Sequence, residues 1–192
     1  MRKLKMFMHT SLDGFVTDQD GGMRWIIMDE PVFQFVGKKI SDEIGSALYG
    51  RVTYDMMEAY WPTAAQHPDA SDQTKRHAQW YQRVDKIVLS TKLTTDDETV
   101  TVIPNNLVNR IKEQKSKPGK DIVIFGSPST THSLLEHDLI DGCWLFVNPV
   151  LLGKGTSLFS RVPQMMKLTL TEIHKFDSGV LFLNYERGGE ER

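Results

Sequence analysis

The sequence predicts an α/β fold: three α/β/α layers, with a mixed, mainly parallel sheet and antiparallel strands at the C-terminus. Two patterns lead to this prediction. Up to about residue 140, short apolar segments alternate with helical patterns, as they do in parallel β-α-β units. Beyond that point apolar segments follow one another without helices, which is typical of antiparallel strands added at one edge of a sheet.

Strands are expected where a few mainly apolar residues lie between turn residues, at 4–10, 46–49, 86–90, 100–103, 121–125, 143–147, 168–175 and 180–185. The almost continuous apolar run at 121–125 indicates a buried parallel strand. The last two strands flank Asp177, Ser178 and Gly179, which predict a hairpin turn.

Helices are expected where apolar residues recur every three or four positions, at 32–44, 53–60, 106–115 and 129–135. Asn106 is the predicted cap of the third helix. Residues 61–73 are polar and contain two prolines, so a loop is predicted there. The basic stretch 75–83 is interpreted as a solvated face. We expect one domain over residues 1–192, with its core at about 3–187.

Composition excludes several classes of partner. The formal net charge is -2, from 23 basic and 25 acidic residues, and no basic run indicates nucleic acid or an anionic membrane. No run approaches the ~20 apolar residues of a membrane span. The single cysteine, Cys143, cannot form an internal disulfide and has apolar neighbours, so a buried structural thiol and a cytoplasmic location are expected.

Three strand ends carry residues suited to a phosphate, and ligands of open α/β sheets lie beyond the carboxyl ends of strands. At the first, Gly50 lets a ligand approach the backbone and Thr53 opens a helix, whose positive end attracts a phosphate. Arg51 adds a planar fork of donors for a phosphate monoester.

The second strand end carries two hydroxyls and a cation: Ser90, Thr91 and Lys92. The third carries Gly126, then Ser127 as a helix N-cap, Pro128, Ser129 and Thr130. Amides and hydroxyls suit a pyrophosphate, whereas cations suit a 2′-phosphate, so the combination favours NADPH over NADH. The alternative is that each segment is an ordinary strand-to-helix loop. Neither a GxGxxG nor a GxxxxGK[ST] motif is present.

At these residues the chain resembles the dihydrofolate-reductase-like superfamily. Residues 50–54 (GRVTY) are similar to the Gly-Arg-x-Thr-aromatic motif of dihydrofolate reductases. The pair SLDG at 11–14 and PVLLGKG at 149–155 resembles the riboflavin-biosynthesis reductase C-terminal domain (RibD_C) family. The resemblance extends over about residues 3–187. It implies an α/β/α fold, NADPH as cofactor and a homodimer.

The resemblance also implies roles for single residues. Thr53 and Ser90 match cofactor-contacting positions, and Arg51 matches an arginine that meets the adenosine phosphates. Trp25 matches a tryptophan on the nicotinamide side. The residues of the matching pyrophosphate loop are Gly126, Ser127, Ser129 and Thr130.

Two departures bear on the substrate. Phe125 stands where the riboflavin enzyme has a substrate-holding acid, and Ser41 stands near the position of an expected arginine. We therefore expect an NADPH-dependent reductase that resembles 5-amino-6-(5-phosphoribosylamino)uracil reductase but acts on another small heterocyclic or conjugated substrate. The alternatives are a dihydrofolate or pteridine reductase, and a non-catalytic nucleotide-binding module.

Two carboxylates are candidate catalytic residues. Glu30 lies five residues after Trp25, as the acid of dihydrofolate reductases follows their tryptophan, and a buried carboxylic acid there could donate a proton. Its alternative is an ordinary first-turn glutamate. Asp13 is either a substrate-side group or a turn-capping aspartate.

The remaining candidates are interpreted as structural. Four methionines, at positions 23, 28, 56 and 57, could line a flexible pocket, but core filling is the favoured interpretation. The six histidines lack metal-ligand spacing, so no metal is predicted.

Overall fold

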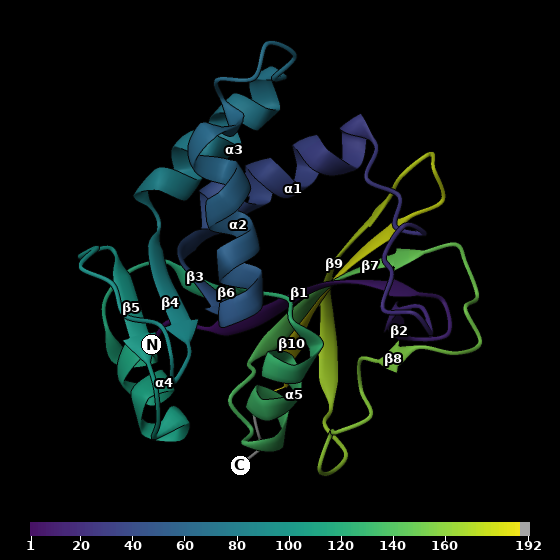
Figure 1. Cartoon of the computed structure of the whole chain (residues 1–192). Coiled ribbons are helices and arrows are strands. Elements are labelled where there is room, and N and C mark those ends of the chain that lie inside the picture. The colour runs from purple at the N-terminus through teal and green to yellow at the C-terminus, as the bar shows by residue number, and fades with distance from the viewer. Residues whose placement is uncertain (189–192) are drawn as a thin grey trace.

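The computed structural model describes residues 1–188 and has one eight-stranded sheet in the order β5-β4-β3-β6-β1-β7-β10-β9 (Figure 1). The six strands from β5 to β7 are mutually parallel, whereas β10 runs antiparallel to both β7 and β9. The prediction of a mainly parallel sheet with antiparallel C-terminal strands is confirmed.

The strands of the main sheet are β1 (Leu4–Ser11), β3 (Ile44–Gly50), β4 (Asp85–Leu89), β5 (Val100–Ile103), β6 (Asp121–Phe125), β7 (Gly142–Asn148), β9 (Leu168–Lys175) and β10 (Leu181–Arg187). The helices are α1 (Glu30–Glu43), α2 (Arg51–Ala64), α3 (Asp72–Arg83), α4 (Leu107–Ser116) and α5 (Pro128–Glu136). Every predicted strand and helix is present, with ends that differ by a few residues.

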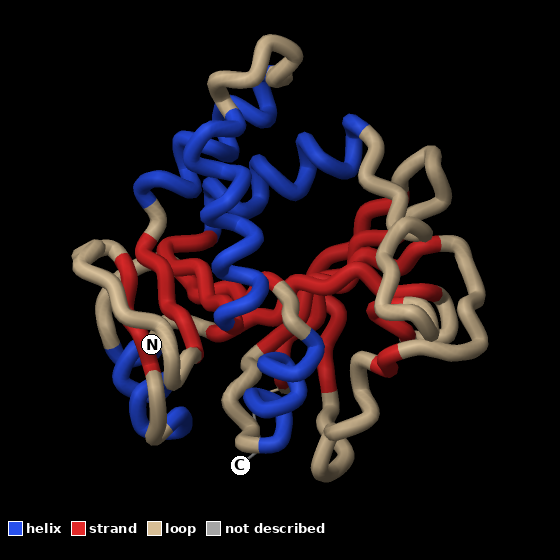
Figure 2. Tube along the Cα trace, in the orientation of Figure 1, coloured by secondary structure: helices blue, strands red, loops and turns tan. Residues whose placement is uncertain are grey.

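The helices cover the two faces of the sheet unequally. In Figure 2, α1, α2 and α3 lie over one face and α4 and α5 over the other, which makes the three predicted layers. The core under α1–α3 is rich in aromatic side chains, whereas the core under α4 and α5 is mainly aliphatic. Within residues 1–188, no helix is both long and apolar enough to cross a bilayer.

The loop predicted at 61–73 is wrong at both ends. Helix α2 continues through Pro62 to Ala64, because the proline falls in the last turn and Ala64 is fully buried. Helix α3 begins at Asp72, where the Ser71 side chain caps it. The stretch 75–83 is only half solvated, since Ala78 and Tyr81 lie in the core.

Two other local features differ from or add to the expectations. Asn106 is the N-cap of α4, as predicted, although its backbone is left-handed (φ 53°) and its side chain makes no capping hydrogen bond. A small antiparallel sheet of β2 (Phe15–Thr17) and β8 (Thr156–Ser157) was not predicted, because elements of two and three residues have no periodicity to detect. Gly155 is needed beside it, since a Cβ there would lie 1.9 Å from the Thr17 carbonyl oxygen.

Candidate cofactor and substrate site

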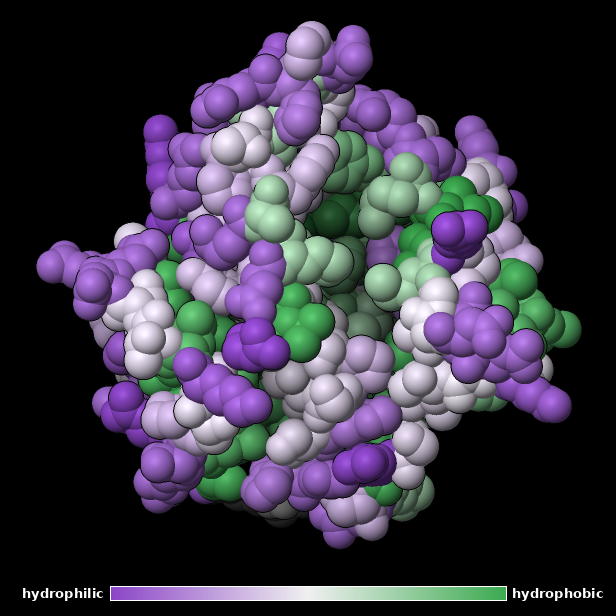
Figure 3. Space-filling view, in the orientation of Figure 1, coloured by the Kyte–Doolittle hydropathy of each residue, from purple (hydrophilic) through white to green (hydrophobic). Residues whose placement is uncertain are grey.

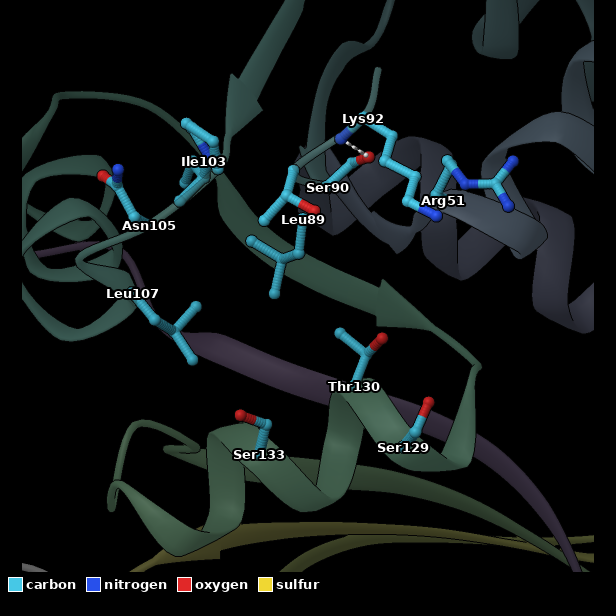
Figure 4. A pocket seen from close by; sticks show the side chains of 12 residues that line it. Arg51, Leu89, Ser90, Lys92, Ile103, Asn105, Leu107, Ser129, Thr130 and Ser133 are labelled. Atoms are coloured by element: carbon cyan, nitrogen blue, oxygen red, sulfur yellow. Dashed lines mark hydrogen bonds between the residues drawn. The ribbon is translucent and has the colours of Figure 1, made fainter.

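A pocket of about 500 Å³ opens where the predicted strand ends meet. Figure 4 shows its walls: the start of α2, the loops after β4 and β5, and the first turns of α5. Six predicted cofactor residues line it: Arg51, Ser90, Thr91, Lys92, Ser129 and Thr130. Ile103, at the end of β5, with Pro104 and Asn105 after it, completes the opposite wall, and none of the three was predicted.

The ends of β3 and β6 approach each other closely beside this pocket. A Cβ on Gly50 would lie 2.4 Å from Thr130 Oγ1, and a Cβ on Gly126 would lie 3.9 Å from Thr53 Oγ1. Ser127 caps α5 by accepting a hydrogen bond from the Thr130 amide. The first and third of the predicted strand ends, with the capped helix α5, are therefore adjacent in space.

Two cations flank the pocket. Ser90 Oγ accepts hydrogen bonds from the amides of Lys92 (3.1 Å) and Leu93 (3.0 Å), which turns the chain after β4. Arg51 pairs with Asp55 at 2.6 Å in an exposed i,i+4 contact. Figure 4 shows the Arg51 and Lys92 side chains on the same side of the pocket. Because an exposed pair stabilises the fold little, Arg51 can exchange Asp55 for a ligand phosphate at small cost.

Trp25 and Glu30 do not line this pocket. Trp25 lies in the loop before α1, where its indole N–H donates to the Gly22 carbonyl (3.2 Å). Glu30 opens α1 as expected but is exposed and accepts a hydrogen bond from Gln34. The expected burial of the Glu30 carboxyl is therefore wrong, and its exposure favours the alternative of a first-turn glutamate. Its role as a proton donor stays a prediction.

The carboxylate of Asp13 holds two loops together, an arrangement that we call the loop clamp. Its carboxylate accepts hydrogen bonds from Ser11 Oγ (2.6 Å) and from the amides of Leu152 (3.1 Å) and Gly153 (2.7 Å). These bonds, the one from Ser11 first, hold the pKa of Asp13 below its usual value. The SLDG and PVLLGKG segments are thus bound to each other, which favours the turn-capping alternative over a proton-donating role.

We expect Asp13→Asn to release this clamp at neutral pH, because an amide nitrogen cannot accept the bond from Gly153. Hydrogen exchange of the Leu152 and Gly153 amides should become roughly five- to tenfold faster. In the wild type the folded pKa is lowered, so the clamp is present at neutral pH and is lost as pH falls through that pKa. The same amide signals should shift in that acidic range. Exposed Asp69→Asn is the control, and unchanged exchange in Asp13→Asn would contradict the clamp.

Two candidate functional residues were not predicted from the sequence. Asn148, at the carboxyl end of β7, is fully buried and bonds to Thr10 O, Phe146 O and the Ile27 amide. It ties the loop before α1 to the sheet. His9, on β1, lies among aromatic rings with neither ring nitrogen hydrogen-bonded. The only sequence signal for either residue is a polar side chain inside an apolar strand.

Residues 2–182 match the model of the RibD C-terminal domain. The chain belongs to this family. The chain is also 30% identical over 190 residues to the uncharacterized protein YyaP of Bacillus subtilis, covering 98% of this chain and 96% of YyaP.

Solved structures have the same fold as this RibD_C chain. A Shewanella sp. PV-4 protein named for riboflavin biosynthesis superposes with a TM-score of 0.73 at 21% identity, over 98% of this chain and 100% of the other. A Thermotoga maritima diaminohydroxyphosphoribosylaminopyrimidine deaminase/5-amino-6-(5-phosphoribosylamino)uracil reductase gives 0.62 at 16% identity. The match covers 97% of this chain but 57% of that bifunctional chain. These likenesses confirm the predicted fold, and the match to the family model confirms the predicted family.

Proposed function

We propose that this chain is an NADPH-dependent reductase of a small heterocyclic or conjugated substrate. The observation that carries the proposal is the pocket of about 500 Å³ at which helix N-termini, hydroxyls and two cations meet. Family membership supports it, and reductase is one of the two activities in the name of the bifunctional structural neighbour. The substrate of that neighbour is not carried over, since the resemblance places Phe125 at the position of a substrate-holding acid and Ser41 near that of an expected arginine.

The residues fit the parts of the cofactor separately. The Ser129 amide in the first turn of α5, with the hydroxyls of Ser129 and Thr130, suits the pyrophosphate. Arg51 and Lys92 suit the 2′-phosphate, which NADH lacks. When bound, the cofactor supplies a hydride to the carbon of a C=N or C=O group and leaves as NADP⁺, while a proton goes to the heteroatom. The protein orients both partners and limits access of water.

A double variant, Arg51→Ala/Lys92→Ala, tests the cofactor assignment. Each lost bond to a charged group is worth about 1.5–3 kcal/mol, so the Kd for NADPH should rise by roughly 100-fold or more. The Kd for NADH should change less than about threefold. Calorimetric titration of both nucleotides measures this difference.

The matched control is Arg161→Ala/Lys167→Ala, which removes the same charge from exposed positions outside the pocket. It should leave both affinities within about twofold of the wild type. If the pocket variant lost equal affinity for NADPH and for NADH, this result would contradict recognition of the 2′-phosphate. Binding of NADPH without its oxidation, across pterins, flavin precursors and quinones, would favour the non-catalytic alternative.

We also propose a homodimer that uses the edge of the sheet at β9. This strand exposes Leu168, Leu170 and Ile173, and Ile173 is 59% exposed. An exposed apolar edge strand is a ready surface for a second copy of the chain. Ile173→Lys should convert a dimer into a monomer in sedimentation experiments, whereas Lys175→Arg should not. A wild-type monomer at micromolar concentration would contradict the proposal.

A further inference from the structure

A second pocket opens at the end of the sheet opposite to the pocket proposed for the cofactor. It is lined by residues at or beside the starts of β3, β4 and β6, whereas the cofactor pocket lies where these strands end. Because β4 is five residues long, the two pockets are roughly 15 Å apart. The second pocket has a volume of about 460 Å³, within the usual range for small-molecule sites. We call it the α3 pocket, since α3 forms one of its walls.

Three cations line the α3 pocket. Arg76 and Arg83 are seven residues apart on α3, which is about two helical turns, so they lie on the same face of the helix. Lys120, just before β6, lines the pocket with them. Within residues 1–188, no carboxylate lines this pocket and none of the three cations forms a salt bridge. The basic stretch 75–83, interpreted from the sequence as a solvated face, therefore contributes two cations to a pocket.

The carboxylates next to the pocket in the chain have other partners. Asp42 forms an ion pair with Lys38 on the same helix, α1. Asp121, which follows Lys120, lies 3.6 Å from the ammonium nitrogen of the buried Lys5. The α3 pocket is thus a positive region on a chain whose formal net charge is -2, and such a region raises the local concentration of anions.

Two of the three cations are held by neutral groups. The Arg76 guanidinium donates to Gln73 Oε1 from Nε (3.3 Å) and from Nη2 (3.1 Å). Gln73 is 5% exposed and packs against α1 at Gly37, where a Cβ would lie 1.5 Å from Gln73 Nε2. Lys120 Nζ donates to the Ser41 carbonyl at 3.1 Å. These bonds position the side chains without neutralising them, so less conformational entropy is lost when an anion binds.

A buried cation adjoins the pocket at Lys120. Arg2 is 7% exposed, and its guanidinium donates to the Lys120 carbonyl (2.7 Å) and to Ser46 Oγ. Burial lowers the pKa of Arg2, while the charges of Asp85 and Asp121 act to raise it. In the part of the chain that the structure describes, neither carboxylate forms a salt bridge with Arg2. A buried cation without an ion-pair partner costs free energy, and an anion in the adjoining pocket reduces that cost.

Trp80 gives the α3 pocket an aromatic wall. Its ring centroid lies 5.2 Å from that of His77 and 6.1 Å from that of Phe125, so the partly buried indole is held by the core. Figure 3 shows mainly hydrophilic residues over the top of the molecule, where α2 and α3 meet in Figure 1, so an indole at the surface of this layer is a local exception. An aromatic wall beside several cations suits a phosphate that is attached to a flat ring.

We propose that the α3 pocket is a second ligand site, which binds a phosphate monoester of a planar ring, such as a nucleoside monophosphate. Arg76, Arg83 and Lys120 bind the phosphate, and the ring packs on Trp80. The site is separate from the cofactor pocket, and the inference does not depend on the proposed reductase function.

NMR titration of the ¹⁵N-labelled wild type with three probes tests the ligand class. 1-Naphthyl phosphate has both the ring and the phosphate, 1-naphthol has only the ring, and inorganic phosphate has only the charge. Because the cofactor pocket can also hold a phosphate, each Kd is taken from the indole N–H signal of Trp80, which is identified by its absence from Trp80→Phe. This signal should shift with 1-naphthyl phosphate, and the Kd should be at least about tenfold higher for the other two probes.

Two double variants test the residues. Arg76→Ala/Arg83→Ala should raise the Kd for 1-naphthyl phosphate by roughly 30-fold or more, because two charged donors are lost. Alanine is a good helix former, so α3 should stay folded. The matched control is Lys75→Ala/Arg161→Ala, which removes the same charge from exposed positions outside the pocket, one of them on α3. It should leave the Kd within about twofold of the wild type.

Four results would overturn the proposal. The first is a Trp80 signal that does not move at saturating 1-naphthyl phosphate, and the second is an equal rise in Kd in the pocket variant and its control. The third is a Kd for inorganic phosphate or 1-naphthol as low as that for 1-naphthyl phosphate. The fourth is a loss of this binding in Arg51→Ala/Lys92→Ala, which would place the probe in the cofactor pocket. None of these measurements uses NADPH, so failure of the reductase assignment and failure of this inference are distinguishable.

Discussion

Replacing Phe146 with alanine is expected to lower the free energy of unfolding by about 3–5 kcal/mol. Phe146 is 1% exposed, and its ring lies within 5.2 Å of the rings of Phe7, His9 and Phe182. Removal of a ring from this position leaves a cavity between β1, β7 and β10, which their backbone hydrogen bonds prevent from collapsing. Urea unfolding followed by circular dichroism measures the loss.

Phe159→Ala is the matched control, because Phe159 is 42% exposed and outside both core clusters. It should cost less than about 1 kcal/mol. A Phe146→Ala protein as stable as the wild type would contradict the described packing.

Replacing Asn148 with alanine is expected to cost about 2–4 kcal/mol, because three hydrogen bonds are lost and their buried partners stay unpaired. The bonds run from Nδ2 to the carbonyls of Thr10 (3.2 Å) and Phe146 (3.0 Å), and from the Ile27 amide to Oδ1 (2.9 Å). Since the last bond ties the loop before α1 to β7, hydrogen exchange of the Ile27 amide should rise further than that of the β1 core. The midpoint of thermal unfolding should fall by roughly 4–16 °C.

Asn109→Ala, at an exposed position of α4, controls for loss of an asparagine and should leave stability within about 0.5 kcal/mol. If Asn148→Ala kept the loop before α1 protected, then Asn148 would not be its anchor. The distinction bears on function, because this loop carries Trp25, Met23 and Met28.

Most of the fold could be predicted from the sequence, because the patterns that indicate helices and strands are local. The apolar run of β6 and the helical spacing of α1 can each be recognised from a short stretch of consecutive residues. Pro62 misled the prediction, since a proline marks a break in sequence but is tolerated in the last turn of α2. The pairing of β2 with β8 depends on contacts between distant segments, which no local pattern reports.

The candidate site also has features that the sequence predicted and features that it did not. The convergence of Arg51, Ser90 and Thr130 was predictable, because carboxyl ends of parallel strands meet at one edge of a sheet. The unpaired state of His9 and the three bonds of Asn148 were not, because each depends on neighbours from other strands. For the methionines, the exposure of the side chains decides between lining a pocket and filling the core. The periodicity of the sequence alone could not decide between them. Three of the four are exposed, so the core-filling prediction is wrong for Met23, Met28 and Met56.

The proposed reductase function requires a dinucleotide to lie across the carboxyl ends of β3, β4 and β6. A crystal structure of the protein with saturating NADPH measures this directly. We predict density for the pyrophosphate at the first turn of α5, near Ser129 and Thr130, and for the 2′-phosphate between Arg51 and Lys92. Density for the cofactor elsewhere, or an empty pocket at saturating NADPH, would contradict the account.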